Sequence, residues 1–175
     1  MGTSFLKGTL KRNLSQFAET SKFHGMQSTD EPWILHNLDD TLSLGNELIT
    51  NLPDLKLLLL EGPLGAGKTS VVKGIAKSLG VIETITSPTF ALAQHYNTKG
   101  KGLIHLDLYR LENTKDADEL FFQEEEEAKA LGALMIIEWP ERLGVSLPEA
   151  WKLSLQYEMQ GGRLAHLSPP CDNKN

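Results

Sequence analysis

The chain has 175 residues, 40% hydrophobic and 23% charged, a composition typical of one globular domain in water. Its only cysteine, Cys171, excludes an internal disulfide, and no apolar run approaches the roughly 20 residues that cross a bilayer. The net charge of −6 argues against unaided binding to a nucleic-acid backbone, which needs clustered Lys and Arg. We therefore expect a cytoplasmic protein without a membrane segment that reaches any nucleic acid through a partner.

Residues 1–31 show no sustained hydrophobic period, and we interpret them as an extension without regular structure. The alternatives are a start at Met26 and an organelle transit segment, because the first 26 residues are Ser-rich and contain one acid, Glu19. Residues 32–167 form the predicted domain, and residues 168–175 are interpreted as a polar C-terminal tail.

The first half of the predicted domain alternates strand and helix. We expect a strand at 33–36, followed by a helix that ends at Pro53 and has Asp39, Asp40 and Thr41 as candidate N-caps. A strand at 57–60 and a helix from Lys68 to Leu79 come next. The strand at 57–60 is continuously apolar, as in a parallel sheet that is covered on both faces.

The second half is predicted to contain two hairpins around a long helix. Its elements are strands 90–96 and 103–108 joined by a turn at 97–102, a helix at 113–131, a strand at 133–138, and strands 151–157 and 163–167 joined by Gly161-Gly162. Together these elements predict an α/β fold, a three-layer sandwich whose mixed sheet has a parallel core and antiparallel edge hairpins.

Between the second strand and the second helix lies the pattern Gly62-x-x-x-x-Gly67-Lys68-Thr69. Such loops cradle phosphates with backbone N–H groups, while the Lys reaches the β and γ phosphates and the Thr hydroxyl binds Mg²⁺. The residues assigned to ATP binding here are Gly62, Pro63, Leu64, Gly65, Ala66, Gly67, Lys68, Thr69 and Ser70. The guanine signature Asn-Lys-x-Asp does not occur, so ATP is the expected nucleotide.

Two carboxylates are candidates for the metal and the attacking water. Glu138 follows four apolar residues, 134–137, and could hold Mg²⁺ or orient water; a surface glutamate is the alternative. Asp107 lies in an apolar strand, where a buried carboxylate needs a partner such as a metal-bound water. Its alternatives are an ion pair with Arg110 and a hydrogen bond to the backbone.

Three further features of the sequence each allow two interpretations or a wider inference. The segment Ser87-Pro88-Thr89 is either a switch-like loop that senses a γ-phosphate or a plain turn. The acidic residues of helix 112–127 form either a solvated face or a docking face for a basic partner. Arginine is scarce, and this scarcity predicts slow hydrolysis by the chain alone and completion by a partner. Arg142 and Arg163 either contact a phosphate or have a surface role.

Four motifs in order carry a family resemblance. They are the phosphate loop at 62–69, Ser87-Pro88-Thr89-Phe90, His105-Leu106-Asp107-Leu108-Tyr109-Arg110-Leu111, and Ile137-Glu138-Trp139-Pro140-Glu141. Over about residues 32–167 the chain resembles the bacterial TsaE (YjeE) family, the ATPase subunit of the tRNA N6-threonylcarbamoyladenosine machinery. The resemblance implies a P-loop fold, ATP and Mg²⁺ as cofactors, and action with TsaB and TsaD, which modify adenosine 37 of tRNA.

The resemblance also implies residue roles. Lys68, Asp107 and Glu138 match the family's catalytic positions, with Thr69, Asp107 and Glu138 around the metal. Trp139 resembles the tryptophan beside the nucleotide, and Thr41 matches the region that approaches the base. The resulting hypothesis is a weak ATPase that supports turnover of the TsaB–TsaD complex; its rivals are a small-molecule kinase and a non-catalytic, ATP-dependent binding module.

Overall fold

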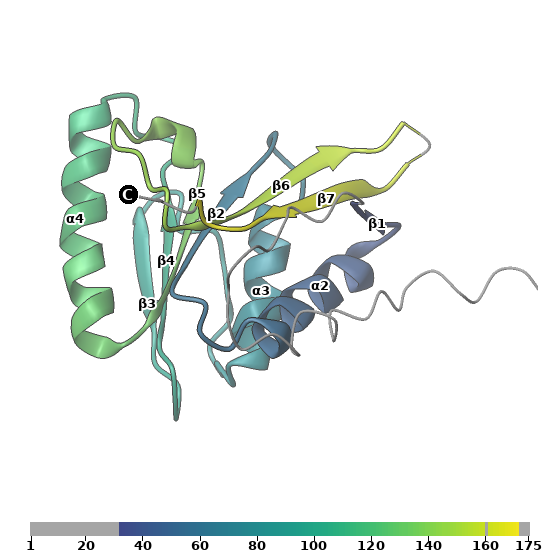
Figure 1. Cartoon of the computed structure of the whole chain (residues 1–175), viewed down its shortest axis with the longest axis horizontal. Helices are drawn as coiled ribbons and strands as arrows, with labels where there is room; N and C mark the ends of the chain where they lie inside the picture. Colours follow the sequence, from purple (N-terminus) through teal and green to yellow (C-terminus); the bar gives the residue numbers. More distant parts are fainter. Residues whose placement is uncertain (1–31, 160, 172–175) are drawn as a thin grey trace, which may run out of the picture.

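A single mixed sheet organises the fold of residues 32–159 and 161–171, which are the residues that the computed structural model describes. Its strands are β1 (Trp33–Leu35), β2 (Leu57–Glu61), β3 (Ala93–Tyr96), β4 (Leu103–Asp107), β5 (Leu134–Glu138), β6 (Trp151–Tyr157) and β7 (Arg163–Ser168). Their order across the sheet is β1-β7-β6-β2-β5-β4-β3 (Figure 1). The interpretation of residues 1–31 lies outside the described residues, as do the last four residues of the predicted tail.

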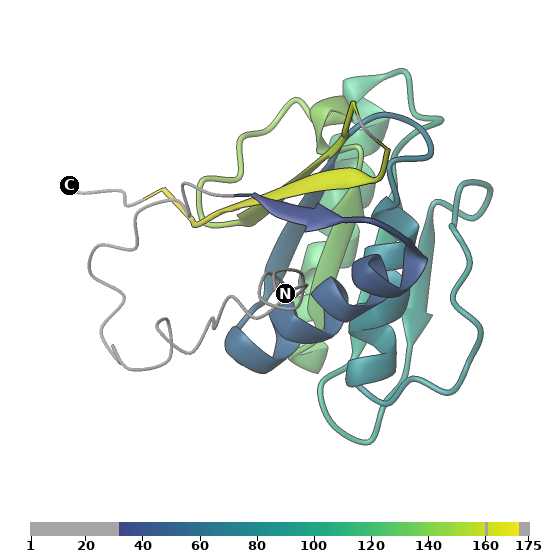
Figure 2. The same ribbon diagram turned by 90° about the vertical axis from the view of Figure 1, so that its right-hand side faces the viewer.

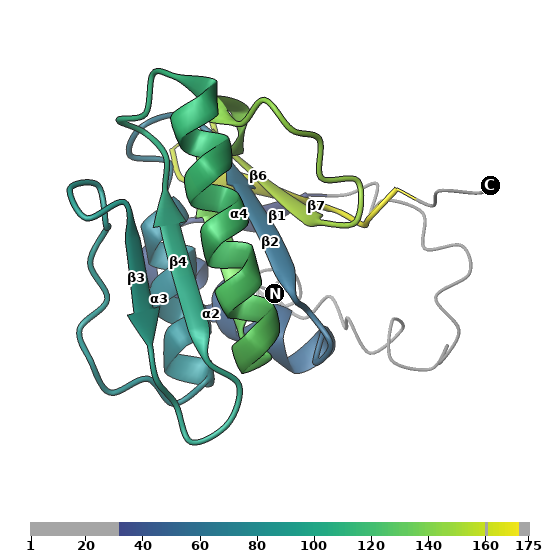
Figure 3. The same ribbon diagram turned by 90° about the vertical axis from the view of Figure 1, so that its left-hand side faces the viewer.

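The centre of the sheet is parallel and its edges are antiparallel. β2 pairs in parallel with β5 and β6, and β4 pairs in parallel with β5. β7 pairs with β6 and with β1 in antiparallel fashion (Figure 2), and β3 pairs with β4 in the same way (Figure 3). The predicted parallel core and both edge hairpins are therefore confirmed, with β7 reaching Ser168, one residue beyond the expected end.

Helices cover both faces of the sheet. α2 (Leu38–Asn51) and α3 (Lys68–Ser78) lie on one face, and α4 (Thr114–Leu131) lies on the other (Figure 3). The alternation within β2 explains this arrangement, because Leu58 and Leu60 pack with the α2 and α3 side while Leu59 packs with the α4 side. The predicted three-layer sandwich is confirmed.

The backbones of α2 and α3 touch where both helices carry glycine. A Cβ atom on Gly74 would lie 2.1 Å from the Leu42 carbonyl oxygen, and one on Gly45 would lie 2.5 Å from the Val71 carbonyl oxygen. Only hydrogen fits at both positions. The close contact holds α2 against the helix that follows the phosphate loop.

The start of α2 differs from the prediction. The N-cap is Asn37, whose Oδ1 accepts a hydrogen bond from the Asp40 N–H at 2.9 Å. Asp40 Oδ2 accepts from the N–H of His36, the residue before the cap, at 2.8 Å, so two side chains bind backbone N–H groups at the start of the helix. Because Asn37 has extended backbone angles, the helix begins ahead of Asp39, and Thr41 is buried within it. The prediction that Asp39, Asp40 or Thr41 is the N-cap was wrong, although the Asp40 side chain binds the backbone just before the helix.

The strand expected from Phe90 begins only at Ala93. Phe90 is 85% exposed, and the Arg110 guanidinium lies over its ring at 4.1 Å from the centroid. Leu92 has a φ of 67°, which breaks the extended conformation directly before the strand. Residues 90–92 are therefore a turn that leads into β3.

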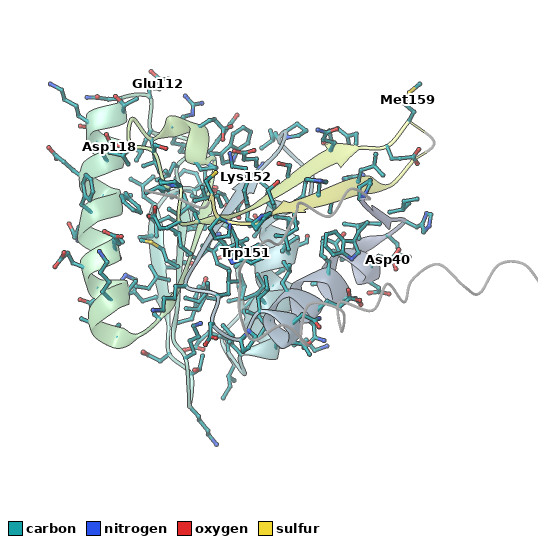
Figure 4. The ribbon with its side chains drawn as sticks, in the orientation of Figure 1. Asp40, Glu112, Asp118, Trp151, Lys152 and Met159 are labelled. Atoms are coloured by element: carbon teal, nitrogen blue, oxygen red, sulfur yellow. The ribbon has the colours of Figure 1, made fainter. Side chains whose placement is uncertain are left out.

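α4 does not present all its acids to water. Glu124 is 6% exposed and pairs with His95 on β3, so its assignment to the acidic face was wrong. Asp118 accepts hydrogen bonds from the N–H groups of Gly144 and Val145, which fixes the loop after η1 (Pro140–Arg142) against the helix (Figure 4). Among the described residues, no helix combines the length and apolarity needed to cross a membrane.

Candidate active site

The phosphate loop occupies the turn from β2 into α3. Gly62 has a φ of 137°, and a Cβ atom there would lie 2.3 Å from the Leu155 carbonyl oxygen on β6. Gly67 is the N-cap of α3 at a φ of 104°, with no side-chain hydrogen bond to the cap. Because a glycine cap has no side chain, it leaves the first N–H groups of α3 without the usual side-chain acceptor, and such N–H groups bind anions at helix N-termini.

Lys68 lies inside this loop and is 5% exposed. Its Nζ donates to the carbonyl oxygens of Gly62 at 2.6 Å and Pro63 at 3.0 Å. Burial lowers the pKa of the Lys68 amine below its ordinary value, while attraction to Glu138, Glu141 and Asp107 opposes this shift. A phosphate would supply the close negative charge that favours the ammonium form.

Thr69 and Glu138 meet beside Lys68. The Thr69 hydroxyl donates to Glu138 Oε1 at 2.8 Å, and Glu138 is the last residue of β5. Glu138 is 3% exposed, so it is not the surface glutamate of the alternative interpretation. The hydroxyl and the carboxylate are oxygen donors of the kind that Mg²⁺ prefers.

Asp107 is the neighbour of Glu138 across the parallel pair β4–β5. Its Oδ2 accepts from the hydroxyls of Ser87 and Thr89, the latter at 2.7 Å, and its Oδ1 accepts from the Tyr109 N–H at 3.0 Å. The backbone bond of the alternative interpretation is therefore present, whereas Arg110 lies on Phe90 instead. These bonds join the Ser87-Pro88-Thr89 loop to the site.

Trp139 forms an aromatic wall next to the lysine. The Lys68 Nζ lies 3.8 Å from the centroid of its ring, and the Tyr109 ring packs at 4.8 Å between centroids. Trp139 has a φ of 61°, a left-handed conformation that costs a bulky residue about 1–3 kcal/mol and is found mostly at functional sites. This backbone turn directs the ring toward the phosphate loop.

The hairpin β6–β7 and helix α2 reach the same loop. Arg163 Nη2 donates to the Gly65 carbonyl oxygen at 3.2 Å, and its guanidinium lies 4.6 Å from the centroid of Tyr157. The Thr41 methyl lies 3.5 Å from where a Cβ on Gly67 would stand. The structure thus brings the predicted residues Thr41 and Arg163 next to the loop.

One residue of the site, His105, was not predicted from the sequence. His105 is fully buried, and its Nε2 lies 2.9 Å from Glu138 Oε1. The signal was available, because residues two apart on a strand share a face and Asp107 follows two positions later. It was overlooked because a histidine in an apolar strand is read most simply as part of the core.

Thr69 and Glu138 fit Mg²⁺ only together with other ligands. Among the described residues, no group of three or more His, Cys, Asp or Glu is placed to hold a metal ion. Mg²⁺ in nucleotide sites takes one or two protein oxygens together with phosphate oxygens and waters. The residues present therefore fit an ion that arrives with a triphosphate.

Comparison with known proteins places the chain in a family. Residues 35–165 match the family model of the threonylcarbamoyl adenosine biosynthesis protein TsaE. The chain belongs to the TsaE family. The TsaE protein of Synechocystis is 40% identical over 120 residues, covering 67% of this chain and 75% of that protein. The TsaE protein of Nostoc is 37% identical over 138 residues, covering 77% and 83%.

The family and both relatives are named for tRNA threonylcarbamoyladenosine biosynthesis, and this chain shares that family role. A solved structure, YdiB of Bacillus subtilis, superposes with a TM-score of 0.57 at 22% identity, covering 82% of this chain and 88% of that one. At this identity the likeness concerns the fold alone. The predicted family and fold are confirmed.

Proposed function

We propose that this TsaE protein is a Mg²⁺-dependent ATPase that supports turnover of the TsaB–TsaD complex during formation of threonylcarbamoyladenosine at adenosine 37 of tRNA. The observation that carries the proposal is the convergence of Lys68, Thr69 and Glu138 beside an uncapped helix N-terminus. They meet at the carboxyl ends of parallel strands, where open α/β sheets bind their ligands.

Each residue has a distinct role in this proposal. Lys68 and the first N–H groups of α3 bind the phosphates, and Thr69 and Glu138 hold Mg²⁺, which neutralises phosphate charge when bound. Glu138 also orients the attacking water. Asp107 fixes the Ser87-Pro88-Thr89 loop beside Glu138 through its bonds to both hydroxyls, so that the loop responds to the γ-phosphate.

The dependence on partners follows from the arginines. The chain contains only Arg12, Arg110, Arg142 and Arg163. Arg110 lies on Phe90, and Arg163 lies on Tyr157 and bonds to Gly65. Supplying an arginine to a phosphoryl-transfer site accelerates hydrolysis by roughly 10³–10⁵-fold. We infer slow hydrolysis by the chain alone and acceleration by TsaB–TsaD, with tRNA reached through that complex.

A binding titration with Mg²⁺ and ATP tests the phosphate site directly. Lys68→Ala removes a charge-assisted contact worth about 1.5–3 kcal/mol, so the affinity should fall about 10- to 100-fold. The matched control is Lys73→Ala on the exposed side of the same helix, which should bind like the wild type. Equal affinity of the Lys68→Ala and wild-type proteins would remove the central assignment.

The two rival functions predict different products. A small-molecule kinase transfers phosphate to an acceptor, but the scarcity of arginine counts against it because acceptor sites for phosphorylated molecules use several arginines. A non-catalytic module forms an ATP-dependent complex without turnover. A single-turnover experiment with TsaB–TsaD should release inorganic phosphate from the wild type, and Glu138→Gln should bind ATP while releasing phosphate much more slowly. Retention of all phosphate by the wild type would favour the module.

A further inference from the structure

His105 lies in the site without a role in the function proposed above. It is fully buried on β4, on the same face of the sheet as Asp107. The register of β4 and β5 pairs Asp107 with Glu138, so His105 is the diagonal neighbour of Glu138 on that face. Its Nε2 lies 2.9 Å from Glu138 Oε1.

The hydrogen-bond network fixes which ring nitrogen carries the proton. A carboxylate oxygen only accepts, so Nε2 must donate to Glu138. His105 Nδ1 is buried and has no hydrogen-bond partner in the described part of the chain. Buried N–H groups without acceptors are rarer than buried acceptors without donors, so the network assigns Nδ1 as the bare nitrogen.

The two carboxylate oxygens of Glu138 differ in their hydrogen bonds. Oε1 accepts from both the Thr69 hydroxyl and His105, whereas no hydrogen bond to Oε2 is formed by the residues from 32 to 159 and 161 to 171. Two donors on Oε1 fix the plane of the carboxylate. Oε2 is left for a group that the described residues do not supply.

Packing alone does not explain the histidine. The neighbouring positions that share its layer, Leu103 and Ile136, are aliphatic, and an aliphatic residue at 105 would avoid leaving Nδ1 buried without a partner. The free-energy cost of burying Nδ1 without a partner is explained if the Nε2–H group is required at its position beside Glu138. The only described acceptor there is the carboxylate that the proposed function assigns to Mg²⁺ and water.

We propose that His105 is a positioning residue, whose Nε2–H group holds Glu138 Oε1 so that Oε2 serves the water and Mg²⁺ of the bound nucleotide. This inference rests on the proposed function. Groups that orient metal ligands in this way change metal affinity or activity by roughly 10- to 100-fold when they are removed.

Two substitutions separate the N–H donor from the space that the ring fills. His105→Leu removes the donor, and His105→Gln restores an N–H group at nearly the position of Nε2. The probe is ATP, titrated into the full chain with Mg²⁺ and with EDTA. His105→Leu should lose roughly 10- to 100-fold of the affinity gained from Mg²⁺ while its Mg²⁺-free affinity stays unchanged, and His105→Gln should regain most of it.

The matched control is His95→Gln, which removes a histidine paired with a glutamate, Glu124, outside the phosphate loop. It should keep the wild-type response to Mg²⁺. A folded His105→Leu protein with the wild-type response would overturn the role of His105, and so would a His105→Gln protein that behaves like His105→Leu. A wild-type chain that binds no ATP would instead overturn the proposed function and this inference with it.

A second measurement needs neither nucleotide nor a leucine variant that folds. Nitrogen NMR of the wild-type chain labelled at its five histidines reports the tautomer of each ring, and the His105→Gln spectrum assigns the signals of His105. The expected result is a proton on Nε2 and a bare Nδ1. A proton on Nδ1 with a bare Nε2 would exclude the donor to Glu138 and overturn the proposal, whatever the nucleotide titrations give.

Discussion

Gly62→Ala perturbs the phosphate loop at the point where it is most tightly confined. The new Cβ would lie 2.3 Å from the Leu155 carbonyl oxygen, which belongs to the backbone of β6 and has no side-chain freedom to move away. A left-handed conformation costs a residue with a Cβ about 1–2 kcal/mol. Forcing the extra methyl group against this backbone adds about 1–3 kcal/mol, the usual cost of overpacking. Together these effects predict a loss of about 2–5 kcal/mol in the free energy of unfolding.

The same substitution should also weaken nucleotide binding, because the loop or β6 must shift and the N–H groups that follow Gly62 shift with it. The assays are urea unfolding and titration with Mg²⁺ and ATP. Gly80→Ala is the matched control, since Gly80 also has a positive φ, of 78°, but its Cβ would meet nothing within 4 Å. If Gly62→Ala destabilised the protein no more than Gly80→Ala and bound ATP normally, the described path of the loop would be refuted.

Two further predictions concern stability. Gly74→Ala should lower the free energy of unfolding by about 1–3 kcal/mol in urea melts, because its Cβ would lie 2.1 Å from the Leu42 carbonyl oxygen and push α2 from α3; an unchanged melt would contradict that contact. Burial lowers the pKa of Lys101, with Asp54 opposing and Lys56 adding to the shift. The unfolded chain then keeps the Lys101 proton to higher pH than the folded one, so this residue should make stability rise with pH in the range below 10.5. Lys101→Gln should flatten that rise, and an equally steep rise in the variant would contradict the assignment.

The elements of the domain could largely be predicted because their signals are local. The continuous apolar run at 57–60 indicated a doubly covered parallel strand, and the glycine spacing at 62–67 indicated the loop. The turns at 97–102 and at Gly161-Gly162 indicated the two hairpins. The start of α2 was misjudged because Asn37, Asp39 and Asp40 are all good capping residues, and backbone angles decide among them.

The site was predicted less completely because its contacts join distant segments. Ser87 and Thr89 contact Asp107 across the β3–β4 hairpin, and no local pattern in either segment indicates that the two are in contact. Glu124 looked like one more exposed acid in a run of glutamates until the fold placed His95 beside it. The left-handed backbone at Trp139 is likewise imposed by packing, since tryptophan has no local preference for it.

The most direct test of the proposed function is the rate of ATP hydrolysis by the wild-type chain with and without purified TsaB–TsaD from the same organism, in the presence of Mg²⁺. The proposal predicts slow hydrolysis by the chain alone, clear acceleration by the complex, and loss of that acceleration in Lys68→Ala. A wild-type rate that the complex leaves unchanged, or a Lys68→Ala protein that is accelerated as much as the wild type, would contradict it.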